Sequence, residues 1–234
     1  MFERTNLLFN MSDLEKFINS NILIVGVGGV GGACLEALVR MGINNITVID
    51  SDVFQESNLN RQLLCTRDNI GHSKVKEAVL RAKSLNSSIN IVDKEMFLNE
   101  ANFDEINIKQ FDYVIDCCDT VTTKYLLIKN CLDNKVKIIS SMGTGNRVDP
   151  TKLEITNIWK TNNDPLAKAM RKILKENGIS KRVNVLCSKE LPKKIKSRNP
   201  GSTAFVPNAA GFCIASFVFN DIMNMGSDLN GTKW

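Results

Sequence analysis

The chain has 234 residues, 43% of them hydrophobic, which is enough to bury the core of one large domain. Its N-terminus lacks the basic stretch and apolar core of a signal peptide, and we expect no apolar run as long as a membrane span, so the composition favours a cytoplasmic protein without membrane contact. The seven cysteines are an odd number without paired spacing, which indicates neither a disulfide framework nor a structural zinc site.

The net charge of +5 is unevenly distributed along the chain. Residues 160–198 carry twelve Lys and Arg against three Asp and Glu, a net charge of +9, so the remainder of the chain carries −4. This asymmetry suits a polyanionic partner that is reached through one region. A solvated helix face followed by a flexible loop would have the same composition.

The first elements expected along the chain are a short helix and a strand. Residues 11–17 have a helical pattern, with Ser12 as the N-cap and Glu15 completing a capping box. The apolar residues 21–25 predict the first strand, and a helix over 29–41 follows it.

The turn between that strand and that helix is rich in glycine, with Gly26, Gly28, Gly29 and Gly31 in close succession. A side chain at Gly26 or Gly28 would keep the backbone away from a phosphate group. The helix then directs free N–H groups and the positive end of its dipole at the same phosphate. We therefore expect a nucleotide site, with a purely structural glycine turn as the alternative.

Polar residues after the second strand extend this expected site. The strand, at 46–49, ends beside Asp50, where an acidic group usually accepts hydrogen bonds from ribose hydroxyls. Asn58, Arg61 and Lys74 then bring donors and two cations to the phosphate side, which is more charge than a dinucleotide needs but suits ATP. Arg61 and Lys74, taken singly, could also be ordinary surface charges.

A further acidic residue is expected at the same edge of the sheet. Strands at 90–92 and 112–115 precede a helix over 120–132, and Asp119 stands at the junction of the second strand and the helix. There its carboxylate could meet the phosphates through Mg²⁺. The alternative is that Asp119 is only the N-cap of the helix.

The C-terminal part changes character after a strand at 136–140 and a small-residue turn at 142–145, which we expect to line an acceptor pocket. Residues 152–157 alternate like an antiparallel edge strand, and 183–186 predict another strand. Between these strands we expect an amphipathic helix over 164–178, with Lys168, Arg171, Lys172 and Lys175 on its polar face. After them we expect a basic, mobile loop over 188–202. The last element, the apolar residues 205–219, is expected to be a buried helix or a dimer contact.

These elements predict one α/β domain over residues 1–234. Its fold is expected to be a Rossmann-like, mostly parallel sheet with helices on both faces and antiparallel strands in the C-terminal part. The nucleotide-binding half would span about 1–145, and the substrate-side half, with the basic loop, about 146–234.

The ordered motifs resemble a known superfamily. The GxGGxG turn, Asp50, residues 58–62 (Asn-Leu-Asn-Arg-Gln), Lys74 and residues 116–119 (Asp-Cys-Cys-Asp) are similar to the ThiF/MoeB/ubiquitin-activating adenylating enzymes. The later motifs resemble one branch, the tRNA threonylcarbamoyladenosine dehydratases, and they are Asp149-Pro150, Asp164-Pro165-Leu166-Ala167, Cys187-Ser188-Lys189-Glu190 and Phe205-Val206-Pro207. The resemblance covers nearly the whole chain.

The resemblance implies a role for each matched residue. ATP would lie on Gly28 and Gly29, with its ribose at Asp50, its phosphates at Arg61 and Lys74 with support from Asn58, and Mg²⁺ at Asp119. Arg61, Lys74 and Asp119 would carry the catalysis. The family also implies a homodimer in which an arginine near the N-terminus, here Arg4, completes the partner's site.

The reaction implied by the resemblance is activation of the threonyl carboxylate of a modified tRNA adenosine, followed by cyclisation with loss of water. The alternative substrate is the C-terminus of a ubiquitin-like sulfur-carrier protein, and a carrier or sulfur-relay protein is a possible partner. This chain lacks, however, the paired CxxC motifs of many relatives that activate sulfur carriers. An NAD-dependent dehydrogenase and a non-catalytic nucleotide-binding scaffold are further alternatives. Cys187 is the best candidate for a thioester, with a buried, inert thiol as its alternative, and His72 is expected on the surface at a helix start.

Overall fold

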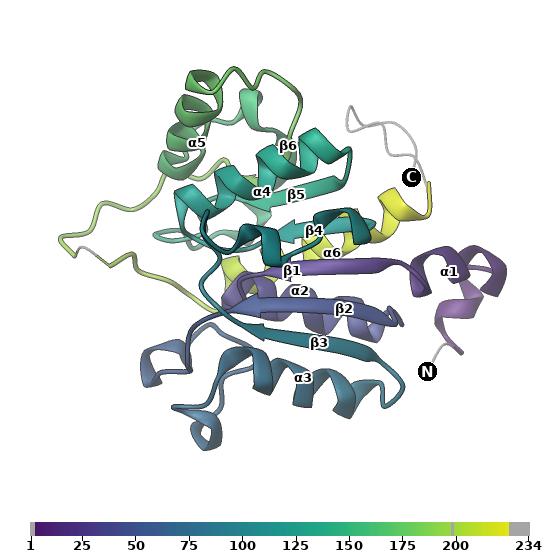
Figure 1. The fold of residues 1–234 in the computed structure, drawn as a ribbon. Helices are drawn as coiled ribbons and strands as arrows, with labels where there is room; N and C mark the ends of the chain where they lie inside the picture. The colour runs from purple at the N-terminus through teal and green to yellow at the C-terminus, as the bar shows by residue number, and fades with distance from the viewer. Residues whose placement is uncertain (1–2, 198, 225–234) are drawn as a thin grey trace.

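The structure, a computed structural model, describes residues 3–197 and 199–224, and within them the strands form one sheet in the order β3-β2-β1-β4-β5-β7-β6 (Figure 1). Neighbouring strands are parallel, except that β6 runs antiparallel to β7. The strands are β1 (Asn21–Val25), β2 (Asn45–Asp50), β3 (Asn90–Glu95), β4 (Tyr113–Asp116), β5 (Lys137–Ser141), β6 (Leu153–Asn157) and β7 (Asn184–Ser188). This Rossmann-like arrangement confirms the predicted fold class, including the antiparallel edge.

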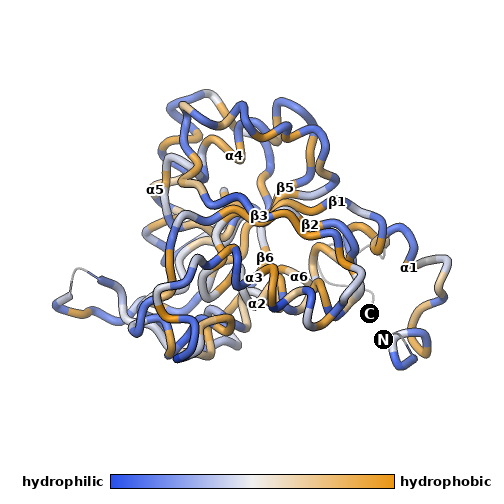
Figure 2. Tube along the Cα trace, turned by 60° about the horizontal axis from the view of Figure 1, so that its bottom comes forward, coloured by the Kyte–Doolittle hydropathy of each residue, from blue (hydrophilic) through white to orange (hydrophobic). Residues whose placement is uncertain are grey.

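Helices cover both faces of the sheet, and each face has its own apolar core (Figures 1 and 2). On one face lie α2, α3 and α6, and on the other lie α4 and α5, while α1 stands at the amino end of β1. The helices are α1 (Met11–Ile18), α2 (Gly29–Arg40), α3 (Lys74–Leu85), α4 (Val121–Asn134), α5 (Pro165–Glu176) and α6 (Phe205–Ile222). Strands such as β1 and β4 are almost continuously apolar because both of their faces are buried.

The last helix, α6, is a core element. It crosses α2 so closely that a Cβ on Gly211 would lie 2.3 Å from the Val30 carbonyl oxygen. By length and hydropathy its 18 residues pass the test for a membrane span, which corrects the expectation that no run is long enough. Half of it is buried against the rest of the domain, as in the core helix of a soluble protein, and we therefore interpret it as a core helix.

Two local expectations differ from the structure. Helix α1 begins at Met11, so Ser12 lies inside its first turn and is not the N-cap. Its position is decided by packing, since the buried ring of Phe17 contacts Phe219 of α6 with ring centroids 4.9 Å apart. Strand β3 continues to Glu95, beyond the apolar residues that predicted it, because its backbone keeps pairing with β2.

The basic segment contains helix α5 and the connection between β7 and α6, which projects from the end of the sheet where the parallel strands finish (Figure 1). Lys168, Lys172 and Lys175 of α5 are exposed as expected. Arg171 is half-buried instead and donates to the carbonyl and hydroxyl oxygens of Thr161, so it anchors α5 and is withdrawn from the polar face.

Candidate active site

One cleft of about 570 Å³ opens at the carboxyl ends of β1, β2, β4 and β5. It lies where the strand order reverses between β1 and β4, which is the usual ligand position in such sheets. Its lining divides into a nucleotide half, formed by segments within residues 25–123, and a substrate half, formed by residues 141–147, 164–166, 192 and 200–202 together with Pro207. The predicted residues Gly26, Gly28, Gly29, Asp50, Asn58, Arg61, Lys74 and Asp119 all line it.

The glycines of the turn have different tasks. Gly26 has a φ of +89°, and a Cβ there would lie 2.8 Å from the backbone of Cys117. A Cβ on Gly31 would lie 1.8 Å from the Gly26 carbonyl oxygen, and Gly31 is not part of the cleft lining. Gly28 is open instead, because the nearest atom to its Cβ position is Nε2 of Gln62 at 3.7 Å. Gly31 is therefore a packing glycine, in contrast to its predicted contact with the nucleotide.

Asp50 is held rigidly at the edge of the cleft. Its Oδ2 accepts a hydrogen bond of 2.7 Å from the Val27 N–H group, and its Oδ1 accepts one of 2.9 Å from the Asp52 N–H group. A carboxylate has about four acceptor positions, so each oxygen can still accept from a ligand hydroxyl. The two backbone bonds fix where a ribose would be met.

The cations of the cleft are oriented by neighbours. The buried Nζ of Lys74 donates to Oδ2 of Asp52 at 2.8 Å, while the Asp52 side chain is 66% exposed. Nη1 of Arg61 donates to the Ser57 carbonyl and to Oδ1 of Asn60. With these contacts, both cations still face the cleft. From the sequence, this ligand site could be inferred only from the order of the motifs along the chain.

Asn58 has a structural task in addition to the predicted one. Its Oδ1 accepts the Gln55 N–H at 3.0 Å and so closes a capping box around the short turn of residues 56–58. Because this oxygen is engaged and could only repel a phosphate, any phosphate contact would come from the side-chain NH₂ group.

Behind the cleft a buried ion pair joins the two halves. Lys124 of α4 is fully buried, and its Nζ donates to both carboxylate oxygens of Asp116 at 3.1 Å and to the Ser141 carbonyl at 2.7 Å. Burial alone would lower the pKa of Lys124, but the Asp116 carboxylate more than offsets this, and the pKa is raised. Ser140 also donates to Asp116, so the ends of β4 and β5 are held together.

Asp119 suits the role of a metal ligand. It is exposed at the cleft, and Thr120, not Asp119, is the N-cap of α4, so the N-cap alternative is wrong. Its Oδ1 receives only a long contact of 3.5 Å from the Thr120 hydroxyl. Mg²⁺ is commonly held by one or two carboxylates together with substrate phosphates, and Asp119 fits that pattern. Within residues 3–197 and 199–224, no group of three or more His, Cys, Asp or Glu side chains could hold a metal alone.

Sequence reasoning missed the residues that organise the substrate half. Arg147 is 2% exposed, donates to the carbonyls of Gly143, Gly145, Asn163 and Glu190, and lies 3.6 Å from Asp164. Asp164 caps α5 through the Ala167 N–H and also accepts the Gly143 N–H. Only the Asp-Pro start of α5 was visible as a signal, because Asn163, Asp164 and Glu190 lie far from Arg147 in the sequence.

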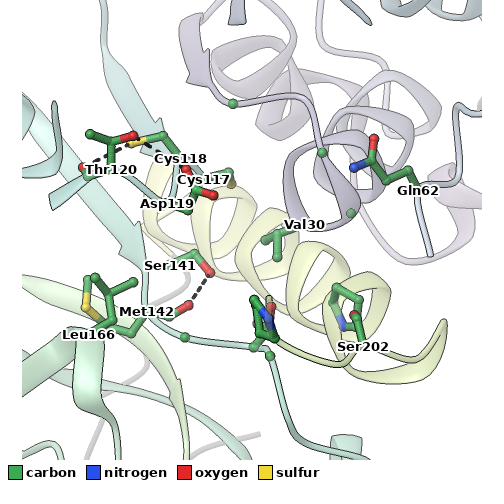
Figure 3. Close-up of a pocket in the computed structure, with 18 of the residues that line it drawn as sticks. Val30, Gln62, Cys117, Cys118, Asp119, Thr120, Ser141, Met142, Leu166 and Ser202 are labelled. Carbon is green, nitrogen blue, oxygen red and sulfur yellow. Dashed lines mark hydrogen bonds between the residues drawn. The ribbon is translucent and has the colours of Figure 1, made fainter. Parts of the chain in front are cut away.

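Gln62 is a further residue that the sequence did not indicate, and it is a candidate ligand contact. Its side chain is buried in the cleft wall, and no hydrogen bond reaches its Oε1 from residues 3–197 and 199–224. Figure 3 shows Gln62 on one side of the cleft and Asp119, Ser141, Met142 and Leu166 on the other, with Val30 between them. A buried acceptor without a partner is costly, so a ligand hydroxyl or a water is expected to donate to it.

The other candidates lie away from the cleft lining. His72 is exposed before α3 and pairs with Glu77 at 2.9 Å, as expected of a surface residue. Burial raises the pKa of Cys187 to about 12, which makes a thiolate there unfavourable at neutral pH. Arg4 precedes the short helix of residues 5–7 next to α1, at the amino end of the sheet, and is not part of the cleft lining of its own chain.

Comparison with known proteins agrees with this geometry. The sequence pattern of the ThiF family matches residues 2–190. The chain belongs to the ThiF family. The tRNA threonylcarbamoyladenosine dehydratase of Bacillus subtilis is 36% identical to this chain, in an alignment that covers 95% of this chain and 94% of that protein.

Two further proteins are similar to this chain to different extents. The crystal structure of the E. coli tRNA N6-threonylcarbamoyladenosine dehydratase TcdA in complex with ATP is matched with a TM-score of 0.89 and 32% identity, over 96% of this chain and 94% of that one. The adenylyltransferase and sulfurtransferase UBA4 of Saccharomyces cerevisiae is 34% identical over 143 residues, which cover 61% of this chain and 32% of UBA4.

Proposed function

We propose that this protein is an ATP-dependent tRNA threonylcarbamoyladenosine dehydratase. The observation that carries the proposal is that the open Gly28 backbone, the fixed Asp50 carboxylate and Lys74 lie in the same cleft as a separate substrate half. The similarity to dehydratases over nearly the full length of the chain supplies the substrate class, a modified adenosine of tRNA.

The residues of the nucleotide half account for activation of a carboxylate. Carboxylate attack on the α-phosphate of ATP expels pyrophosphate and leaves an acyl adenylate, in which AMP replaces hydroxide as the leaving group. Arg61 and Lys74 offset the negative charge that develops on the phosphates. Cyclisation then needs mainly positioning of the bound tRNA, since the attacking group belongs to the same molecule as the acyl carbon.

A magnesium ion at Asp119 is part of the proposal. When bound with ATP, Mg²⁺ would neutralise phosphate charge beside the attacking carboxylate. Asp119 supports this role because its carboxylate faces the cleft and, among the residues that the structure describes, receives only the 3.5 Å contact from Thr120. Replacement of Asp119 by Asn is expected to weaken the dependence of ATP binding on Mg²⁺, which calorimetry at several Mg²⁺ concentrations would measure.

We also propose that the protein acts as a homodimer in which Arg4 completes the partner's site. Two observations support it: Arg4 lies remote from the cleft of its own chain, and α6 leaves Phe205 and Phe212 exposed by 66% and 46% on a helix that is apolar all round. Mixing inactive Arg4→Ala and Lys74→Ala proteins should restore activity by forming one intact site per heterodimer. No recovery after demonstrated subunit exchange would disprove the shared site.

The decisive experiment compares two substrates. Release of pyrophosphate from ATP is measured with tRNA that carries threonylcarbamoyladenosine and, separately, with a carrier protein ending in Gly-Gly. We expect release with the tRNA, a tRNA product lighter by one water, and loss of both signals for Lys74→Ala. Release with the carrier protein alone would favour the activity named for UBA4 and reject the proposal.

A further inference from the structure

Two points of the basic loop (residues 188–202), one near each end, are attached to the same residue of the substrate half, Asn146. The Lys193 N–H group donates to the Asn146 carbonyl, and the Asn146 N–H group donates to the Gly201 carbonyl, each at 2.7 Å. The Gly201 N–H group in turn donates to the side-chain Oδ1 of Asn146, also at 2.7 Å. Asn146 thus holds both ends of the loop at once.

The backbone around Asn146 is shaped for this task. Asn146 has a φ of +60°, in the left-handed region that Asn tolerates better than most residues. At the preceding position, a Cβ on Gly145 would lie 2.8 Å from Cβ of Pro200, so only glycine lets the loop approach this closely. The next residue, Arg147, is buried and fixes the turn through four carbonyl groups.

Asn146 and its three hydrogen bonds to the loop lie between the positive charge of the loop and the cleft. Lys193, Lys194 and Lys196 are exposed on the loop, whereas Asn146 and Gly201 line the cleft. A further bond of 3.1 Å from Nδ2 of Asn60 to the Ser202 carbonyl ties the returning end of the loop to the segment that carries Arg61. Phosphates bound on the loop would therefore be held at a fixed distance from the nucleotide.

We infer that Asn146 is a positioning residue, which fixes the basic loop to the cleft so that tRNA bound through its phosphates presents the modified base to ATP. The inference rests on the proposed function. It assigns to Asn146 an effect on turnover that is separate from the affinity for either substrate, because the residue carries no charge and its bonds go to the loop.

The test uses two variants of the full-length protein. Asn146→Gly tolerates the positive φ but lacks Oδ1, whereas Asn146→Asp tolerates it and keeps an acceptor for the Gly201 N–H group. Hydrogen exchange of the Gly201 amide, the dissociation constants of ATP and tRNA, and kcat of pyrophosphate release are measured for each.

For Asn146→Gly we expect faster exchange at Gly201, dissociation constants within about twofold of wild type, and a kcat lower by roughly ten- to a hundredfold, because misplacement affects reaction more than binding. Asn146→Asp should restore both slow exchange and kcat. A normal kcat in Asn146→Gly despite fast exchange, or unchanged exchange, would overturn the inference while leaving the proposed function intact. Wild-type protein without activity on tRNA would reject both.

Discussion

The nucleotide half and the substrate half of the cleft are held in place by different kinds of contact. In the nucleotide half, Gly26 directly follows β1 and Asp50 is the last residue of β2, and their hydrogen-bond partners lie at the carboxyl ends of the same two strands. In the substrate half, Arg147 and Asn146 hold segments that are far apart in sequence, at residues 163, 190, 193 and 201. The first half is thus an outcome of sheet formation, and the second depends on individual side chains.

The largest expected effect comes from the ion pair that joins the halves. Lys124→Met leaves the buried Asp116 carboxylate without its counter-charge and should reduce the free energy of unfolding by about 3–5 kcal/mol. Denaturant titration measures it. On the same helix, Lys129 pairs with Asp133 at the surface, and Lys129→Met should cost less than about 1 kcal/mol. Equal losses in the two variants would contradict the structural role of Lys124.

Within the nucleotide half, replacing Gly31 or Gly28 by alanine should distinguish a glycine that folding requires from one that ATP binding requires. Gly31→Ala must displace the Gly26 carbonyl and should cost about 1–3 kcal/mol of stability. In Gly28→Ala, the nearest described side-chain atom to the new Cβ is Nε2 of Gln62 at 3.7 Å, so the variant should fold normally yet weaken ATP binding by about tenfold, or 1.4 kcal/mol. Thermal unfolding and calorimetry on both variants check this, and normal ATP affinity in Gly28→Ala would move the phosphates elsewhere.

The ion pairs of Glu36 with Arg40 and Arg81, which connect α2 and α3, should make the stability of the protein depend on pH. Buried Glu36 of α2 accepts hydrogen bonds from Arg81 of α3 and from Arg40. Burial tends to raise the pKa of Glu36, but the two guanidinium groups lower it by more, so the pKa lies below its usual value. The stabilisation is therefore present above pH 4.5 and is lost as the pH falls through the folded-state pKa. Glu36→Gln should cost about 1–2 kcal/mol at pH 7.

Unfolding free energies of wild type and Glu36→Gln across pH 7 to 3 test this prediction. The difference between the two proteins should shrink in acid, because protonated Glu36 no longer benefits from the arginines. A difference that stays constant, or grows as the pH falls, would show that the carboxylate charge is not what stabilises this contact.

The smallest effect for each side chain is expected on the basic loop of the substrate half. Lys193, Lys194 and Lys196, replaced together by Ala, should reduce the salt slope of tRNA binding by about 0.7–0.9 for each phosphate that is no longer neutralised, and should leave ATP binding unchanged. Lys109→Ala with Lys135→Ala, at the amino end of the sheet, is the matched control. An unchanged slope in the triple variant would place the RNA contact outside this loop.

The positions predicted from the sequence agree with the structure for residues at or just after the carboxyl ends of strands. Gly28, Asp50 and Asp119 were placed at one edge because parallel strands bring their carboxyl ends together, and the cleft lining agrees. Prediction was incomplete where a motif position has a packing task, as in Gly31, whose spacing fits a nucleotide motif but which is needed as glycine for the close contact with the Gly26 carbonyl. Arg171 and Ser12 were misplaced because tertiary contacts, not helical periodicity, decide their environment.

The sequence by itself determined the sheet, the family and the nucleotide half, because strand periodicity and the spacing of glycine and acidic residues act over a few tens of residues. Only the tertiary structure decided that Arg147 and Asp164 shape the substrate half and that Asn146 holds both ends of the basic loop. Apart from the Arg147–Asp164 ion pair, these bonds involve backbone carbonyl or N–H groups, which every residue carries. Their partners therefore leave no trace in the sequence until folding brings them together.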